Sequence, residues 1–366
     1  MKKYYVGLKS NNAICNENYF DGSITLYPTG EPGNIFYSST QLDDISSEIF
    51  MNNYKDYLTK NISQHKDAEF VIFNKKIYDL CKNIPNCNIV YNDNSELLDF
   101  INNKFLIREF LKNDVNLLDY KICEITEDNY EQIFNDYSEN LVIQGRSGSG
   151  GENTYLIKDK KLFKKLNLFG EFSISKYLSN TPLNVTMIIG KQDIDLFPIS
   201  AQLIEIVDNR FKYVGGDFIY PQYLDKTIVK EIEKYSLKIA KKLKNEGYLG
   251  IMGIDYVLAN NKVYFMEINP RFQSSSFLIN LYLKKLYNMS LAELHTQAIK
   301  EKRVPYVKLS KIDYSFLNCN QEIEYDEFTS CDIIYNGYCQ NIHGLIYRKL
   351  YNKSLIKSKK FERETW

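Results

Sequence analysis

One stretch of the sequence decides the fold: residues 253–273, which read GIDYVLANNKVYFMEINPRFQ. Two apolar runs flank the pair Asn260-Asn261, and such a pair between apolar runs is typical of a tight hairpin turn. We therefore predict two antiparallel strands joined by a short polar turn. Each strand carries one acid in an otherwise apolar setting, Asp255 on the first and Glu267 on the second.

The two acids have further polar neighbours in sequence. Asn269 lies two positions after Glu267, so both side chains point to one face of an extended strand, and Arg271 and Gln273 continue that face. Oxygen ligands of this kind suit Mg²⁺, which takes one or two carboxylates and completes its shell with phosphates and water. The arginine would then face the anion beside the metal. Acids that only face solvent are the alternative, and their apolar neighbours make it the weaker one.

The composition is that of an ordinary soluble globular protein. The 366 residues are 44% hydrophobic and 25% charged, with 46 basic and 46 acidic side chains. This length allows two or three packed lobes. The charge balance gives no field toward nucleic acid or an anionic membrane. The basic residues at the start have no long apolar run behind them, and no stretch approaches the length of a spanning helix, so we expect neither a signal peptide nor a membrane span. Seven scattered cysteines without a Cys-x-x-Cys pair indicate reduced thiols and a cytoplasmic location.

Alternating strand and helix patterns through the first hundred residues predict a small α/β lobe. Farther along, residues 227–246 and 276–300 each read as one helix. Only three histidines occur, His65, His295 and His343, and none lies in a recognisable catalytic motif. The sequence therefore favours chemistry that needs no histidine base.

Three weaker signals precede the hairpin. Residues 141–157 read as strand, Gly/Ser loop and strand; such a loop can point several N–H groups at a phosphate, but it can also be a plain connector. Since no helix follows, it fits neither a Walker loop nor a Rossmann fingerprint. Residues 174–178 could present backbone groups to an adenine edge, and Lys104 could reach a phosphate. An ordinary strand and a solvated lysine are the alternatives.

In this order, the four stretches resemble the ATP-grasp superfamily, closest to biotin carboxylase, carbamoyl phosphate synthetase and the related carboxylate–amine ligases. The resemblance covers roughly residues 98–300. It implies an α/β fold in which two lobes clamp ATP. The expected domains are an N-terminal α/β domain (1–100), an ATP-grasp domain (101–300, small lobe about 115–175, large lobe about 176–300) and a strand-rich C-terminal segment (301–366).

The resemblance also implies roles for the matching residues. Asp255, Glu267 and Asn269 would hold Mg²⁺, usually two ions, with Mn²⁺ as an alternative. Arg271 would bind the acyl phosphate or the carboxylate that becomes it, and Arg146 is a second candidate catalytic residue. The implied ATP contacts, with 176–178 as the adenine hinge, are Lys104, Gln144, Ser147, Gly148, Ser149, Gly150, Gly151, Ser175, Lys176, Tyr177, Leu178, Asn184, Val257 and Met266.

The chain departs from the family pattern at two places. The family usually has a second lysine on the strand before the Gly loop, where Gln144 stands here; either Arg146 supplies that charge or Gln144 binds as a neutral donor. Biotin carboxylases have an acid–His pair after their Arg-x-Gln, whereas Gln273 is followed by Ser274-Ser275-Ser276. Their Gln-Lys before paired acids is also missing from residues 200–205. Bicarbonate chemistry is therefore disfavoured.

The sequence thus predicts an ATP-dependent ligase that activates a small carboxylate as an acyl phosphate for attack by an amine, with release of ADP. Two alternatives stay open. One is a biotin-independent carboxylase or carbamoyl-phosphate-type kinase on the same scaffold; the other is a non-catalytic ATP-binding regulator. The expected partners are the carboxylate and the amine, without nucleic acid or membrane. A homodimer is common in the resembling families.

Overall fold

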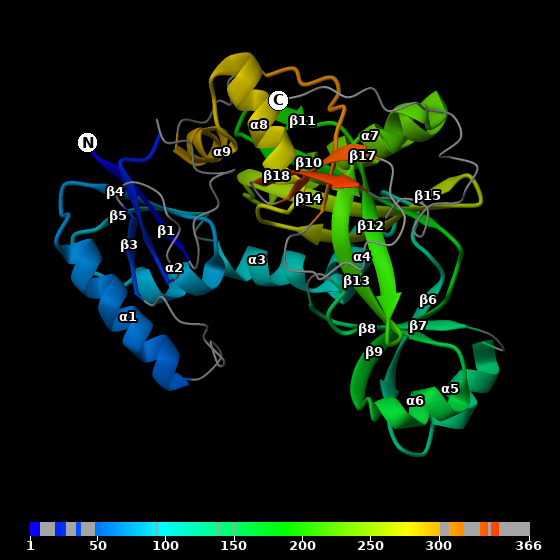
Figure 1. The fold of residues 1–366 in the computed structure, drawn as a ribbon. Coiled ribbons are helices and arrows are strands. Elements are labelled where there is room, and N and C mark those ends of the chain that lie inside the picture. The colour runs from blue at the N-terminus through cyan, green and yellow to red at the C-terminus, as the bar shows by residue number, and fades with distance from the viewer. Residues whose placement is uncertain are drawn as a thin grey trace.

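The computed structural model describes residues 1–7, 19–26, 34–37, 48–92, 94–137, 140–148, 151–300, 307–317, 330–335 and 338–343. The chain begins with a parallel sheet of strand order β3-β2-β1-β4-β5. β4 is buried along its whole length, as parallel strands covered on both faces are. Figure 1 shows this sheet in blue with α1 beside it. The elements are β1 (Lys3–Gly7), β2 (Gly22–Thr25), β3 (Asn34–Phe36), α1 (Glu48–Ser63), β4 (Glu69–Ile72), α2 (Lys75–Cys81) and β5 (Asn88–Val90).

Two helices, α3 (Ser95–Asn102) and α4 (Lys104–Leu111), connect this sheet to the rest of the molecule. Asn103 ends the first and caps the second, because its Oδ1 accepts hydrogen bonds from the backbone N–H groups of Phe105 and Leu106. Lys104 is therefore the first residue of a helix. α4 packs against the strand that carries Glu267.

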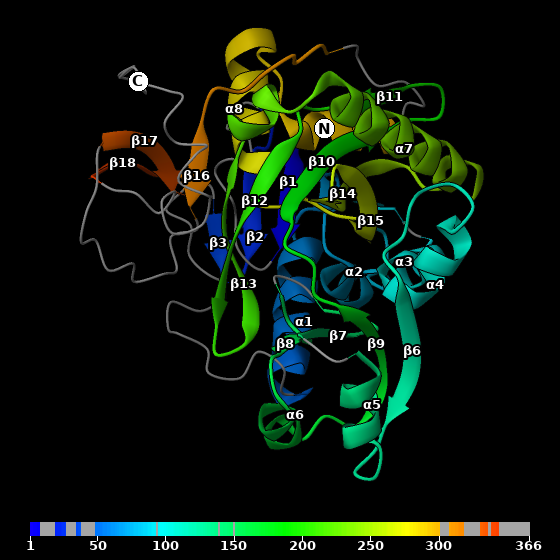
Figure 2. The ribbon, with the colours of Figure 1, turned by 90° about the vertical axis from the view of Figure 1, so that its right-hand side faces the viewer.

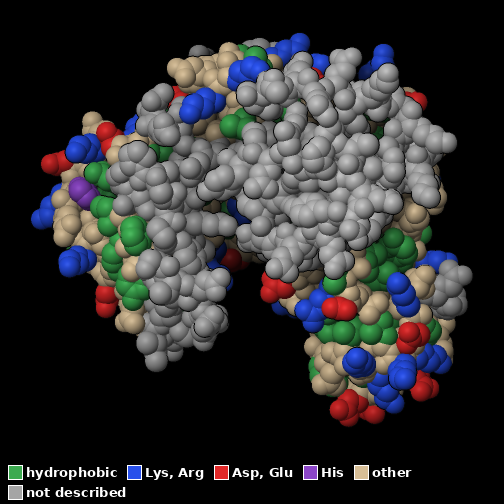
Figure 3. All heavy atoms as spheres, in the orientation of Figure 1, with side chains coloured by type: hydrophobic (Ala, Val, Ile, Leu, Met, Phe, Trp, Pro, Cys, Tyr) green, Lys and Arg blue, Asp and Glu red, His purple; other side chains and the backbone are tan. Residues whose placement is uncertain are grey.

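The small lobe is an antiparallel sheet of order β8-β7-β9-β6 with two helices. Figures 1 and 2 show it below the main body of the molecule. In Figure 3 its surface carries acidic and basic side chains intermixed, so this face has no field of a single sign. The elements are β6 (Tyr120–Ile125), α5 (Tyr130–Tyr137), β7 (Leu141–Gly145), β8 (Thr154–Ile157), α6 (Lys160–Leu166) and β9 (Gly170–Lys176).

The large lobe holds the predicted hairpin at the edge of the sheet order β15-β14-β10-β12-β13. Asn260 and Asn261 both have positive φ, 50° and 58°, as a two-residue hairpin turn requires. The hairpin prediction is confirmed. The elements are β10 (Thr181–Ile189), β11 (Ile194–Leu196), β12 (Ser200–Val207), β13 (Arg210–Asp217), the 3₁₀ helix η1 (Tyr220–Tyr223), α7 (Lys226–Asn245), β14 (Gly250–Ala259), β15 (Lys262–Asn269), α8 (Ser276–Tyr287) and α9 (Leu291–Lys300).

The single helix predicted over residues 276–300 is wrong, because the structure has two. Asn288 adopts a left-handed conformation (φ 52°) and ends α8. The Oγ of Ser290 then accepts a hydrogen bond from the backbone N–H of Glu293 at the start of α9. The predicted helix over 227–246 is confirmed as α7, one residue earlier at each end. Beyond residue 300, the described strands are β16 (Ser315–Leu317), β17 (Ser330–Tyr335) and β18 (Tyr338–His343).

The two lobes share one continuous sheet. The β12–β13 hairpin of the large lobe reaches β8 of the small lobe, where Arg210 pairs with Tyr155. The backbone N–H of Leu156 donates to the carbonyl of Asn209 at 2.8 Å, and the Arg210 guanidinium lies 5.5 Å from the centre of the Tyr155 ring. Figure 1 shows this long green hairpin running down from the large lobe to the small one.

Buried His295 on α9 joins the N-terminal sheet to the large lobe. Its Nδ1 accepts a hydrogen bond from the backbone N–H of Ile251 at 2.9 Å, so the ring proton lies on Nε2. Its ring meets those of Phe73 and Phe272 edge-on. Burial lowers the pKa of His295 to about 3.

We predict a stability loss in mild acid that depends on His295. Below pH 6.5 the unfolded chain protonates this ring and the folded chain does not, so its contribution to stability is lost as pH falls. The free energy of unfolding should fall by about 2 kcal/mol between roughly pH 7.5 and pH 5 from this group. Urea unfolding at both pH values should show this loss of unfolding free energy in wild type and in His65→Gln, and a smaller loss in His295→Gln. An equal loss in His295→Gln and in wild type would contradict the prediction.

Candidate active site

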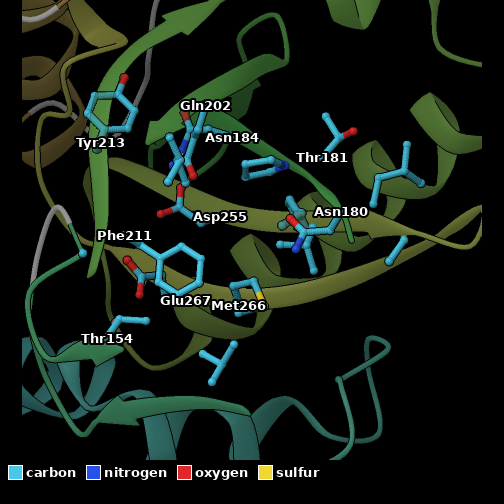
Figure 4. A pocket seen from close by; sticks show the side chains of 18 of the residues that line it. Thr154, Asn180, Thr181, Asn184, Gln202, Phe211, Tyr213, Asp255, Met266 and Glu267 are labelled. Atoms are coloured by element: carbon cyan, nitrogen blue, oxygen red, sulfur yellow. The ribbon is translucent and has the colours of Figure 1, made fainter. Parts of the chain in front are cut away.

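Three neighbouring strands place a row of polar side chains across the sheet. Asn184 on β10 lies opposite Asp255 on β14, and Asp255 lies opposite Glu267 on β15. The Nδ2 of Asn184 donates to Oδ1 of Asp255 at 2.6 Å, and the Nδ2 of Asn269 donates to Oδ2 at 3.0 Å. Figure 4 shows Asp255 and Glu267 reaching into one cavity, with Asn184 and Gln202 on one side and Met266 on the other.

A bulge in β15 puts the two acids on one face. Near the turn, Ala259 pairs with Lys262 and Tyr256 with Phe265, a register in which Asp255 would pair with Met266. The register shifts there, so that Met266 has no partner and Asp255 pairs with Glu267. Because successive side chains in a strand point to opposite faces, an unbulged hairpin would turn Glu267 away from Asp255. The bulge thus places the Asp255 and Glu267 side chains next to each other on one face of the sheet.

Basic side chains compensate the charge of this pair. The Nζ of Lys104 lies 2.7 Å from Oε2 of Glu267, and only 7% of the lysine side chain is exposed. Burial and the neighbouring Glu267 raise the pKa of Asp255. Burial also opposes the ionisation of Glu267. The positive charges of Lys104 and Arg108 outweigh this effect of burial and hold the pKa of Glu267 below its usual range. Glu267 is therefore the acid that stays ionised most readily.

The residues after the hairpin close one end of the row. Arg271 donates from Nη2 to Oδ1 of Asn269 at 3.0 Å and from Nη1 to its neighbour's carbonyl at 3.1 Å. Gln273 lies against Gly253, where a Cβ would come within 1.5 Å of its Oε1, so a side chain at this position would displace the Gln273 amide. That Oε1 accepts from Nδ2 of Asn184 at 3.0 Å.

The first residues of α8 complete this wall. The hydroxyl of Ser275 donates to Oδ1 of Asn184 at 3.1 Å rather than capping the helix. Neither His65 nor His295 lines the cavity. This end of the site is thus built from amides, hydroxyls and one guanidinium.

A cavity of about 1270 Å³ lies between the two lobes and contains this row. Of the residues that the sequence singled out, it is lined by Lys104, Gln144, Gly151, Ser175, Lys176, Tyr177, Leu178, Asn184, Asp255, Val257, Met266, Glu267, Asn269 and Arg271. Ser147 and Gly148 are described and do not line it, and Ser149 and Gly150 lie outside the described residues. Arg146 does not line it either, because its guanidinium pairs with Glu171 at 2.5 Å.

The segment 176–178 joins the lobes at the edge of the cavity. The backbone N–H of Tyr177 donates to the carbonyl of Asn140 at 2.9 Å, which ties the segment to the small lobe. Apolar side chains from both lobes face the cavity near it, and sequence reasoning missed most of them: Val142, Ile204, Ile206 and Phe211. The alternation of Ile204 and Ile206 along β12 is the signal that could have identified one wall.

The acids and the amide form a donor set that fits Mg²⁺. Like charges directly opposite on neighbouring strands repel, and a divalent cation between Asp255 and Glu267 would relieve that repulsion. Among the described residues, no group of three or more His, Cys, Asp or Glu side chains could hold a metal, so Asn269 would be the third donor. All three face the cavity.

Comparison with known proteins agrees with this geometry. Residues 101–275 match the ATP-grasp domain. The tyramine–L-glutamate ligase of Methanocaldococcus fervens is 27% identical over 253 residues, 65% of this chain and 77% of that protein. The [butirosin acyl-carrier protein]–L-glutamate ligase of Niallia circulans is 22% identical over 233 residues, 58% of this chain and 53% of that protein.

The fold is similar to that of solved structures. The ADP complex of an N5-carboxyaminoimidazole ribonucleotide synthetase has a TM-score of 0.58 and 15% identity, with coverage of 84% of this chain and 79% of that chain. This protein therefore carries an ATP-grasp domain and has distant ligase relatives. The predicted resemblance and the α/β fold class are confirmed. In the described part of the chain, no helix has the length and apolar character needed to cross a membrane.

Proposed function

We propose that this protein is an ATP-dependent ligase that activates a small carboxylate as an acyl phosphate and transfers the acyl group to an amine, releasing ADP and phosphate. The observation that carries the proposal is the row of Asp255, Glu267 and Asn269, with Arg271 beside it, inside a cavity lined by both lobes. Such a row suits the triphosphate end of a nucleotide together with the anion formed from it.

The cavity offers contacts of two kinds to ATP. Apolar side chains near the 176–178 segment, with Met266 and Val257, suit the faces of the adenine ring. The phosphates would lie toward Lys104, Gln144 and Gly151. Asp255, Glu267 and Asn269 would hold Mg²⁺. When bound, Mg²⁺ would neutralise charge on the phosphate oxygens.

The chemistry that follows needs no histidine. An oxygen of the substrate carboxylate attacks the γ-phosphorus, and the bond from that phosphorus to the β-phosphate oxygen breaks, so ADP leaves. The amine nitrogen then attacks the acyl carbon, inorganic phosphate departs, and the nitrogen loses its proton to phosphate or water. Arg271, which keeps N–H groups beyond its two intramolecular bonds, would hold the acyl phosphate. Positioning and electrostatics supply the rate.

The names of two relatives support a choice of carboxylate. Both the tyramine ligase and the acyl-carrier-protein ligase act on L-glutamate, although their other substrates differ. We therefore propose L-glutamate, or a similar amino acid, as the acyl donor and a small amine as the acceptor. The wall of Gln273, Ser275 and Asn184 lacks an acid–His pair, which argues against a bicarbonate-dependent carboxylase on this scaffold.

A direct assay tests this function. With Mg²⁺ and ATP, we expect ADP release that requires both L-glutamate and an amine, and mass spectrometry should detect the amide when pools of small amines are screened. ADP release with bicarbonate and no amine would instead identify a carboxylase or carbamoyl-phosphate-type kinase. Tight ATP binding without turnover across all pools would identify a regulator. Light scattering would decide whether the active form is a homodimer.

A further inference from the structure

Arg108 is a buried cation directly behind the wall of the cavity. It lies on α4 one turn after Lys104, and it is 5% exposed. Its Nε donates to the carbonyl of Met266 at 3.1 Å, its Nη1 to the hydroxyl of Ser173 at 3.3 Å, and its Nη2 to Oε1 of Gln144 at 2.5 Å. One guanidinium thus joins β15 of the large lobe to β7 and β9 of the small lobe.

The first of these contacts holds the bulge in β15. Met266 is the residue that the register skips, and its carbonyl accepts a hydrogen bond from the Nε of Arg108. A buried carbonyl without a donor is costly, and Arg108 supplies the donor. Since the bulge turns Glu267 toward Asp255, Arg108 stabilises the backbone shape that brings the two acids together.

The contact with Gln144 fixes the orientation of its amide. A guanidinium has donors only, so Gln144 must turn its oxygen toward Arg108. Its Nε2 then points the other way and lies 3.4 Å from Oγ1 of Thr154, a residue that also lines the cavity. Gln144 therefore presents N–H groups at the cavity wall, in the charged environment of the guanidinium behind it.

We propose that Arg108 is a positioning residue with two roles at the phosphate end of the site. It orients Gln144 as a hydrogen-bond donor to the nucleotide phosphates. It also stabilises the bulge at Met266 that turns Glu267 toward the cavity. This rests on the proposed nucleotide function. In this proposal Arg108, and not Arg146, supplies the positive charge beside Gln144. The guanidinium of Arg146 pairs with Glu171, and Arg146 does not line the cavity.

Gln144→Glu tests the donor role without threatening the fold. Glutamate still accepts from Arg108, and more strongly, but it cannot donate to a phosphate. By isothermal titration, the affinity for Mg·ATP should fall about tenfold to a hundredfold, while that for adenosine stays unchanged. The melting temperature should be equal to or above wild type. Gln64→Glu, which adds the same charge at an exposed position, should bind both ligands as wild type does.

Arg108→Lys tests the positioning role, because lysine keeps the charge and loses the fork that reaches three partners. We expect Mg·ATP affinity to fall about tenfold or more with adenosine affinity retained. A purely structural role would weaken adenosine and ATP together. If this variant does not fold, Gln144→Glu alone decides. Wild-type Mg·ATP affinity in either folded variant would overturn the inference and leave the proposed function standing. A wild-type protein that binds no ATP would overturn both.

Discussion

Replacing Glu267 with Gln should lower ADP formation by at least about a hundredfold while the protein stays folded. Glu267 is the acid that Lys104 pairs with and that remains ionised most readily, so it carries the negative charge at the end of the cavity where we propose that Mg²⁺ binds. Glutamine keeps the shape and an acceptor oxygen for Lys104 but not the charge. ADP release under saturating ATP and substrate, together with the melting temperature, measures both expectations.

A matched control for this variant is Glu109→Gln. Glu109 is an exposed acid on α4, the helix that also carries Lys104, and it pairs with Lys112 outside the cavity. It should turn over ATP as wild type does. If Glu267→Gln forms ADP at the wild-type rate with an intact fold, the metal assignment of Asp255, Glu267 and Asn269 is wrong.

Arg271→Ala should lower the yield of coupled amide product by about 10²–10³-fold and leave nucleotide binding nearly unchanged. The guanidinium is held by Asn269 and by a backbone carbonyl at the end of the row of acids, where the acyl phosphate would form. Mass spectrometry measures the yield of amide product, and isothermal titration measures the affinity for Mg·ATP, so the two effects can be told apart.

The conservative variant sharpens this test. Arg271→Lys keeps a positive charge but cannot bind a phosphate with two parallel hydrogen bonds, so it should recover only part of the lost product. Should nucleotide affinity collapse in Arg271→Ala while product per ADP stays constant, Arg271 contacts the nucleotide rather than the acyl group.

The hairpin and the alternation of strands and helices follow from local patterns in the sequence, and the resemblance to the ATP-grasp superfamily implied part of the cavity lining. Apolar runs around Asn260-Asn261 define the two strands, and the spacing of acid and amide is visible in the chain. The bulge at Met266 is different. It depends on a carbonyl that finds its donor in Arg108, a residue 158 positions away, and no local pattern specifies that contact.

The sequence does contain one indication that Arg108 lies near the site. It follows Lys104 by four positions, so the two basic side chains share one face of α4. What the sequence could not give is the long-range geometry that puts this face behind the cavity. For the same reason Phe211, which reaches the cavity only because the β12–β13 hairpin crosses to the small lobe, was not predicted.

The contact between the β12–β13 hairpin and β8 also limits how the two lobes can move. The two chain crossings between the lobes run side by side at one edge of the small-lobe sheet, since Tyr120 pairs with Ser175. The hairpin tip holds the opposite edge through Asn209 and Arg210. Arg108 adds a further link, from β15 to β7 and β9. The small lobe is thus bound to the large lobe at both edges of its sheet and through this guanidinium, and moving the hairpin tip away from the small lobe requires the pairing with β8 to break.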